Sequence, residues 1–241
     1  MLRTIIFLIF IVIAFIISLP FLLIARLVDG KDKFAPIPKS AGFIAGKIAP
    51  LAAKLAGCKY RIEGIENIPD APLMFAGNHQ GAFDALFLLF AFGRVPVIMA
   101  KKETSKIPVV NLWMKTIHTI FIDRKDIRQS LQCIKDAEAY LENGFSFAVF
   151  PEGTRSRGPE MGEFKPGVFK TAIKTKTAVV PFAIDGTYKV YEQPKWLSKA
   201  DVTLRILEPI AIDGTEKTQE LADEVKSKIQ RALDEIRERN E

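Results

Sequence analysis

Hydrophobic and polar positions divide the chain into two parts with different patterns. Residues 4–25 contain no charged side chain and read TIIFLIFIVIAFIISLPFLLIA. From residue 59 onward, short apolar runs alternate with stretches in which apolar residues recur at helical spacing. The pattern predicts a membrane-anchoring helical segment over residues 1–58, followed by a folded domain over residues 59–241 that is long enough to have its own core.

The first apolar run has the length of a membrane helix. As a helix, residues 5–25 would be about 31 Å long, which matches a hydrocarbon core of about 30 Å. A secretory signal peptide is the alternative, but the run is too long and no small-residue cleavage site follows it. We expect Pro20 to bend this helix.

A second, amphipathic segment follows over residues 39–55. It is rich in small residues, and its spacing puts three lysines on one helical face: Lys39, Lys47 and Lys54. Two arrangements of the two segments remain open. They are one span followed by an interfacial helix, and a helical pair embedded in one leaflet.

The remainder of the chain alternates between strand and helix patterns. Seven runs are typical of strands: 59–63, 73–77, 95–100, 119–122, 145–150, 178–183 and 202–207. Four stretches are typical of helices: 82–92, 127–143, 169–176 and 218–239. This alternation predicts an α/β layered domain, with a largely parallel or mixed sheet flanked by helices.

The net charge of +6 lies entirely in the N-terminal quarter. Residues 1–60 carry eight Lys or Arg and two Asp or Glu, and the remaining chain is balanced. A nucleic-acid-binding protein usually carries its basic patch on the folded domain, so we expect no nucleic-acid partner. Positive charge beside an apolar helix favours membrane lipids with an anionic phospholipid surface as partner. For a spanning helix, this charge places the folded domain on the cytoplasmic face of the inner (plasma) membrane.

Cysteine and histidine are both scarce. Cys58 and Cys133 are far apart in apolar contexts, which indicates no disulfide framework and a reducing compartment. Only His79 and His118 are present, which argues against a multi-histidine metal site. We therefore expect no metal, and we expect His118, inside an apolar run, to be structural.

The stretch GNHQGAFDA, residues 77–85, places a histidine directly after a predicted strand. Within one regular helix, His79 and Asp84 would point about 140° apart. They can meet only if His79 precedes or caps the helix and Asp84 lies in its first turn. In that geometry the carboxylate holds Nδ1–H of the imidazole and leaves Nε2 as a general base. The alternative is a capping residue followed by a solvated acid.

Two further stretches place arginines after predicted strands. In FIDR, residues 121–124, Arg124 is either a ligand-binding residue at a strand end or a surface arginine paired with a nearby aspartate. In FPEGTRSR, residues 150–157, Gly153 allows an unusual turn, and two arginines present planar guanidiniums that match phosphate geometry. We expect Glu152 to accept a hydrogen bond from a ligand hydroxyl or to orient an arginine.

In order and spacing, NHQGAFDA, FIDR, FPEGTRSR and VVPFAI resemble the four motif blocks of the 1-acyl-glycerol-3-phosphate acyltransferase (lysophosphatidic acid acyltransferase) family. The resemblance covers residues 72–188, and FKPG departs from it, because Pro166 stands where relatives more often have a second basic residue. It implies that His79 is the catalytic base and Asp84 its partner. It also implies that the acceptor's phosphate and glycerol are bound by Arg124, Glu152, Gly153, Thr154 and Arg155.

The resemblance implies acyl transfer from an acyl-CoA or acyl carrier protein thioester to the free sn-2 hydroxyl of lysophosphatidic acid, which gives phosphatidic acid. The acceptor hydroxyl is the nucleophile, so no cofactor beyond this cosubstrate is needed. A membrane anchor suits a lipid acceptor and a water-soluble donor. The candidates for an acyl groove, with ordinary core as the alternative, are Leu86, Phe87, Leu89 and Phe90.

Three other functions remain open. The first is acyl transfer to another lysophospholipid. The second is a membrane-bound lipid esterase, which needs an exposed serine in G-x-S-x-G; the nearest match centres on Ser146, among bulky apolar residues, and Ala148 replaces the last glycine. The third is a non-catalytic phospholipid-binding module, which would leave His79 and Asp84 without a role.

Overall fold

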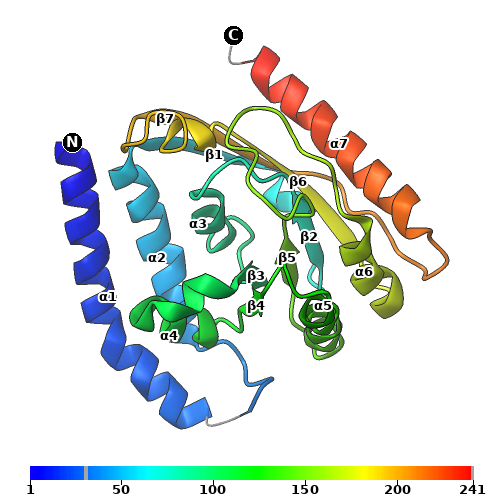
Figure 1. The fold of residues 1–241 in the computed structure, drawn as a ribbon, viewed down its shortest axis with the longest axis horizontal. Helices are drawn as coiled ribbons and strands as arrows, with labels where there is room; N and C mark the ends of the chain where they lie inside the picture. Colours follow the sequence, from blue (N-terminus) through cyan, green and yellow to red (C-terminus); the bar gives the residue numbers. More distant parts are fainter. Residues whose placement is uncertain (30–31, 240–241) are drawn as a thin grey trace.

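The computed structural model describes residues 1–29 and 32–239 and arranges them around one mixed β-sheet (Figure 1). Within these residues the sheet has seven strands in the order β1-β7-β6-β2-β5-β3-β4. The predicted α/β layered fold with a mixed sheet is confirmed. The strands are β1 (Cys58–Glu63), β2 (Met74–Gly77), β3 (Val97–Lys101), β4 (Ile120–Ile122), β5 (Phe147–Val149), β6 (Val179–Asp185) and β7 (Ala200–Ile206).

Strand direction brings the candidate residues to one edge of the sheet. The strands β6, β2, β5, β3 and β4 run parallel, whereas β7 runs antiparallel to β6 and β1 parallel to β7. Every residue of β2, β5 and β6 is buried, as expected for strands covered on both faces. The segments after β2, β5 and β4 therefore leave the sheet at the same carboxyl edge.

Helices cover both faces of the sheet. One hydrophobic cluster joins the sheet to α5 (Ile127–Glu142), α6 (Lys170–Thr175) and α7 (Thr218–Glu238). A second cluster joins the opposite face to α2 (Lys39–Ala56), α3 (Asp84–Leu88) and α4 (Pro108–Thr116). Figure 1 shows α7 on one side and α2 on the other, with α1 (Leu2–Asp29) outermost. The predicted apolar stripe of the last helix is buried: Leu221, Val225, Ile229, Leu233 and Ile236.

Three local features of the structure differ from what the sequence pattern predicted. The helix predicted over residues 82–92 is limited to α3, because turns follow it and Gly93 has a φ of +66°. Helix α4 was not predicted, although Pro108 occupies its first turn, where proline is favoured. His118 lies outside β4 with a φ of +57°, and its Nε2 donates to the carbonyl oxygen of Ala35 at 2.7 Å.

The N-terminal helix α1 is long and apolar enough, over Leu2–Ile24, to cross a membrane. It contains Pro20, and Figure 1 shows it bending before its end. Its outward apolar side chains are exposed, and a stripe of buried alanines on α2 allows close packing of helices on the inner side. Lys47 and Lys54 are exposed on α2, and the side chain of Lys39 lies outside the described part of the chain.

Helix α1 also contacts the folded domain at several points along its length. Near its start, Thr4 Oγ1 accepts a hydrogen bond from the Leu197 amide at 3.3 Å. One turn later, the Phe7 ring lies 5.8 Å from the Phe83 ring, between centroids. Further along, Ser18 Oγ accepts a hydrogen bond from Trp113 Nε1 at 2.8 Å. The helix is thus held against the domain rather than projecting from it.

Candidate active site

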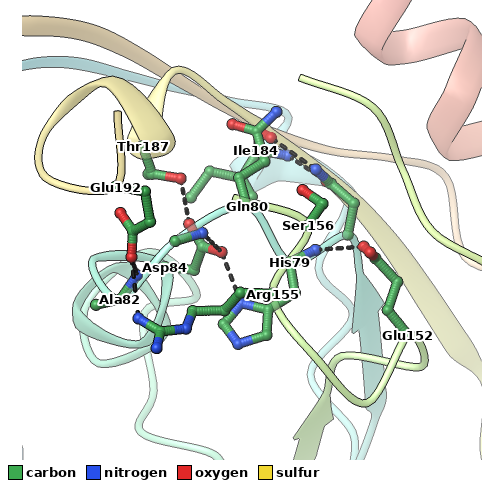
Figure 2. A network of polar contacts seen from close by, with 12 residues as sticks. His79, Gln80, Ala82, Asp84, Glu152, Arg155, Ser156, Ile184, Thr187 and Glu192 are labelled. Atoms are coloured by element: carbon green, nitrogen blue, oxygen red, sulfur yellow. Dashed lines mark hydrogen bonds and ion pairs between the residues drawn. The ribbon is translucent and has the colours of Figure 1, made fainter. Parts of the chain in front are cut away.

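The pair His79 and Asp84 forms the centre of the candidate site. Helix α3 begins at Asp84, and His79 lies in the turn after β2, so the two side chains meet with Nδ1 and Oδ2 2.7 Å apart (Figure 2). This is the arrangement that the spacing of five residues permits. Asp84 is fully buried; its Oδ2 also accepts from the Gly81 amide at 2.8 Å, and its Oδ1 accepts from the Thr187 hydroxyl.

The imidazole is fixed by packing as well as by this hydrogen bond. The His79 ring stacks on the Phe150 ring, with centroids 4.0 Å apart and planes 7° apart. Its side chain is 15% exposed. No hydrogen bond among the described residues uses Nε2, so this nitrogen can accept a proton from a ligand.

Two loops carry the site and are joined through the main chain. We call residues 78–83 the histidine loop and residues 150–165 the arginine loop. The Ser156 amide donates to the His79 carbonyl oxygen at 2.8 Å, and the Arg157 amide donates to the Gln80 carbonyl oxygen at 3.1 Å. These two bonds fix the position of one loop against the other.

Glu152 fastens the two loops rather than facing open space. Its Oε1 accepts from the His79 amide at 2.6 Å, and its Oε2 accepts from the Gly162 amide at 2.9 Å. The residue is 4% exposed. Burial raises the pKa of Glu152, although the two amide hydrogen bonds act in the opposite direction. Among the described residues Glu152 accepts from no arginine, so the predicted orientation of an arginine is not seen, and a contact with a ligand hydroxyl stays a prediction.

Arg155 brings a guanidinium to the candidate site. Figure 2 shows its side chain passing beside the His79 ring, with the guanidinium reaching Glu192. Its Nη1 donates to Glu192 Oε1 at 2.9 Å, and the side chain is 37% exposed. No hydrogen bond among the described residues uses Nε or Nη2 of Arg155, so these donors can meet an anion.

The other residues predicted to bind phosphate lie at two places along the edge of the sheet. Gly153 has a φ of +68°, and a Cβ there would lie 2.9 Å from Lys165 Nζ, so this amine sits directly against the turn. Thr154 is exposed on the same turn. Arg124 is exposed after β4, three strand positions from β2, or about 14 Å at the usual strand spacing. The structure therefore groups His79 with the arginine loop and places Arg124 farther along the edge.

The predicted acyl-groove residues pack in the core cluster on the α2 and α3 face. Phe87 is completely buried, and its ring lies 5.7 Å from the Tyr60 ring, between centroids. Leu86, Leu89 and Phe90 are partly buried at the border of the same cluster. Phe87 therefore has the core role given as the alternative, and a groove role for the other three stays a prediction.

Several polar residues that hold the site were not singled out from the sequence. The Asn78 side chain exchanges two hydrogen bonds with the main chain of Ile184, both at 2.8 Å. The Gln80 side chain donates to Asp185 Oδ1 at 3.0 Å and accepts from the Gly186 amide at 2.9 Å. Asn78 and Gln80 flank His79 in the first motif, which is the signal that could have identified them.

Neither a disulfide nor a metal cluster occurs in the described ranges 1–29 and 32–239. Both cysteines are free and buried. No group of three or more His, Cys, Asp or Glu side chains in these ranges has a geometry that could hold a metal ion. The side chains described at the site supply an imidazole, carboxylates and guanidinium or amine cations.

Comparison with known proteins gives a consistent family. A family model described as Acyltransferase matches residues 59–185, more than half of the chain. A chloroplastic 1-acyl-sn-glycerol-3-phosphate acyltransferase from Arabidopsis thaliana is 34% identical over 180 residues, covering 73% of this chain and 49% of that protein. A 1-acyl-sn-glycerol-3-phosphate acyltransferase from Borreliella burgdorferi is 37% identical over 134 residues, covering 55% of this chain and 54% of that protein.

A solved structure is similar over almost the whole chain. The crystal structure of the 1-acyl-sn-glycerophosphate acyltransferase PlsC from Thermotoga maritima superposes with a TM-score of 0.83 at 28% sequence identity. The match covers 98% of this chain and 95% of that one, so it includes the N-terminal helices. By contrast, the matched part of the chain spans about half the length of the first curated relatives.

Proposed function

Since the chain belongs to the acyltransferase family, we propose that it is a 1-acyl-sn-glycerol-3-phosphate acyltransferase. It transfers a fatty acyl group from a thioester to the free sn-2 hydroxyl of lysophosphatidic acid, and the product is phosphatidic acid. The observation that carries the proposal is the His79–Asp84 pair, 2.7 Å apart, with the Arg155 side chain beside it. The names of the Arabidopsis, Borreliella and Thermotoga relatives support the same activity.

His79 is the general base of the proposed reaction. Its Nε2 takes the proton of the acceptor hydroxyl while the oxygen attacks the thioester carbonyl carbon. The tetrahedral intermediate then collapses, the C–S bond breaks, and the imidazolium returns the proton to the departing thiolate. Asp84 holds Nδ1–H throughout, which fixes the tautomer and stabilises the imidazolium. Proton transfer of this kind contributes about 10²- to 10⁴-fold in rate.

The arginine loop binds the phosphate of the acceptor. Arg155 offers Nε and Nη2, Lys165 offers an amine against the Gly153 turn, and Thr154 offers a hydroxyl. Arg124 contributes from farther along the edge of the sheet, where its exposed side chain can reach toward the same anion. Glu152 contributes by holding the two loops in place, because its two oxygens accept from main-chain amides. Fixing the anion orients the hydroxyl toward His79, and orientation can lower the barrier by several kcal/mol, up to about 7–11 kcal/mol in total.

The donor is acyl-CoA or an acyl carrier protein thioester, and the reaction needs no further cofactor. The partly buried side chains of Leu86, Leu89 and Phe90, at the border of the core near the histidine loop, are suited to contact an acyl chain.

Helix α1 anchors the enzyme to the cytoplasmic face of the membrane. Its contacts with Leu197, Phe83 and Trp113 favour a helix embedded along one leaflet, because a spanning helix would carry these domain residues into the bilayer. Basic residues near both helices, including Arg3, Lys47 and Lys54, attract anionic phospholipid headgroups. The acceptor then reaches the site from the lipid and the donor from the cytoplasm.

The test measures thiol release by the purified full chain in mixed micelles, with either donor and a panel of lysolipids. The expected result is release that depends on lysophosphatidic acid and is abolished by His79→Ala, with circular dichroism unchanged. Retention of a tenth of the activity by that variant removes His79 from the role of base. Release without any acceptor indicates an esterase, release only with another lysolipid indicates a different acceptor, and no release under any condition indicates a binding module.

A second variant tests the phosphate contact. Arg155→Ala should raise KM for lysophosphatidic acid by at least about tenfold, because a charge-assisted pair of hydrogen bonds is lost, and should leave KM for the acyl donor nearly unchanged. Equal changes in the two KM values contradict the assignment of Arg155 to the phosphate.

A further inference from the structure

Glu192 is a buried carboxylate at the candidate site that belongs to none of the four motif blocks. It follows η4 (Thr187–Lys189), beyond residues 59–185 that match the family model. The residue is only 6% exposed. Its Oε1 accepts two hydrogen bonds, from the Ala82 amide at 2.7 Å and from Arg155 Nη1 at 2.9 Å (Figure 2).

The carboxylate is packed directly against the main chain of the histidine loop. A Cβ at Gly81 would lie 2.7 Å from Glu192 Oε2 and 3.3 Å from the carbonyl oxygen of Thr187. Glycine at position 81 is therefore what allows this approach. Oε2 itself is buried and has no hydrogen-bond partner among the described residues. Burying a carboxylate with one oxygen unpartnered destabilises the fold. We therefore expect Glu192 to have a role other than stabilising the fold.

The reason lies in what Glu192 holds. Its arginine partner is more than a third exposed and has Nε and Nη2 unused within the described residues. An arginine in this position loses many side-chain conformations when it binds an anion, unless a protein group already fixes it. Glu192 fixes one nitrogen of the guanidinium and leaves Nε and Nη2 without a hydrogen-bond partner among the described residues.

We infer that Glu192 is a positioning residue that holds Arg155 beside His79 for binding the phosphate of the acceptor. The inference rests on the proposed function. The same segment supplies Thr187, whose hydroxyl donates to Asp84 Oδ1. Residues 187–192 therefore hold two groups of the site: Asp84, the partner of His79, and Arg155.

The kinetic test is a double-mutant cycle with Glu192→Gln and Arg155→Ala. Gln keeps the volume and one acceptor oxygen but removes the charge, and a charge-assisted hydrogen bond is roughly twice as strong as a neutral one. The expected result is a KM for lysophosphatidic acid that rises about tenfold in E192Q, while kcat and KM for the donor change less than about threefold. In the Arg155→Ala background, E192Q should have almost no further effect.

Glu63→Gln is the matched control. Glu63 also accepts from an arginine, Arg205 Nε at 2.8 Å, but it lies at the carboxyl end of β1, at the opposite edge of the sheet. E63Q should leave both KM values unchanged. Equal effects of E192Q with and without Arg155 overturn the inference, as does a KM that falls because the removed negative charge strengthens attraction for phosphate.

A second readout does not depend on turnover. In protein labelled with ¹⁵N-arginine, the Nε–Hε signal of Arg155 is identified by its loss in Arg155→Ala, and its heteronuclear NOE reports motion of the side chain. The NOE should fall in E192Q and stay constant in E63Q, and an unchanged value in E192Q overturns the inference. If the wild-type chain releases no thiol with lysophosphatidic acid, the proposed function fails, and this readout still decides whether Glu192 holds Arg155.

Discussion

The imidazole of His79 lies flat on the ring of Phe150, with centroids 4.0 Å apart and planes 7° apart. Phe150 in turn meets Phe182 of β6 edge to face at 6.0 Å. A line of three rings therefore connects the candidate base to the buried middle of the sheet. Asp84 fixes the imidazole at Nδ1 and Phe150 fixes its plane, so Nε2 has one direction in which to act.

Removing the Phe150 ring should slow catalysis without abolishing it. An aromatic pair contributes about 0.5–1.5 kcal/mol beyond its buried area, so Phe150→Leu is expected to lower kcat about 2- to 10-fold. Phe150→Tyr keeps the stacking and should retain most of the activity. Steady-state kinetics with saturating lysophosphatidic acid provides the measurement, and equal activities of the Leu and Tyr variants would contradict a role for the stacked ring.

Asp84→Asn should be more harmful, because the carboxylate accepts from three donors at once. An amide has one oxygen and would turn its NH₂ group toward at least one of those donors. We expect kcat to fall by about 10²-fold or more, in the range of general base catalysis, with KM for the acceptor changed little. A variant with more than a tenth of wild-type kcat shows that the imidazole does not depend on this partner.

Glu152 should make stability depend on pH in a predictable direction. Since burial raises the pKa of Glu152, the folded state binds its proton more tightly than the unfolded state. The contribution of Glu152 to the free energy of unfolding therefore falls as pH rises from the ordinary glutamate pKa through the raised one. Glu152→Gln has no such titration, so the free energy of unfolding of the wild-type chain relative to this variant should decrease as pH rises.

Urea unfolding in detergent at several pH values measures this difference. The free energy of unfolding of the wild-type chain relative to the Gln variant should be largest at low pH and should decrease toward neutral pH. A relative value that grows as pH rises would mean that the folded state prefers the ionised carboxylate.

The Cys58 thiol should be inert in the folded protein. Burial raises its pKa to about 12, so at pH 8 only about one thiol in 10⁴ is ionised, and the thiolate is the reactive form. Burial also raises the pKa of Cys133. A colorimetric thiol reagent should therefore label neither cysteine in native protein and both in denatured protein. Rapid labelling of the native chain would show that β1 opens on the timescale of the reaction.

The sequence was sufficient for the parts of the fold and site that depend on local pattern. Alternating apolar runs predicted the mixed α/β sheet, and the apolar stripe of residues 218–239 predicted α7. The predicted order of strand, turn and helix around His79 allowed its pairing with Asp84, because the two residues are only five positions apart. Helix α4 was not predicted, because its nine residues are fewer than the roughly 11–18 over which a helical period is read.

Long-range contacts explain what the sequence did not predict. Thr187 and Glu192 lie more than 100 positions from the histidine loop that they hold, and only the pairing of β6 with β2 brings them there. The inward direction of Glu152 was equally inaccessible. It depends on two amides, one from His79 and one from Gly162, whose positions are known only once both loops are in place.

The two main-chain bonds that join Ser156 to His79 and Arg157 to Gln80 have a consequence for how an acceptor is chosen. Because these bonds hold the two loops together and Glu192 holds the guanidinium of Arg155, the separation of imidazole and guanidinium is a fixed span rather than an adjustable one. In the proposed reaction, a molecule is accepted when its own hydroxyl and its own negative charge are the right distance apart. Discrimination then depends on the internal spacing of the acceptor, and a stronger attraction for its headgroup cannot substitute for it.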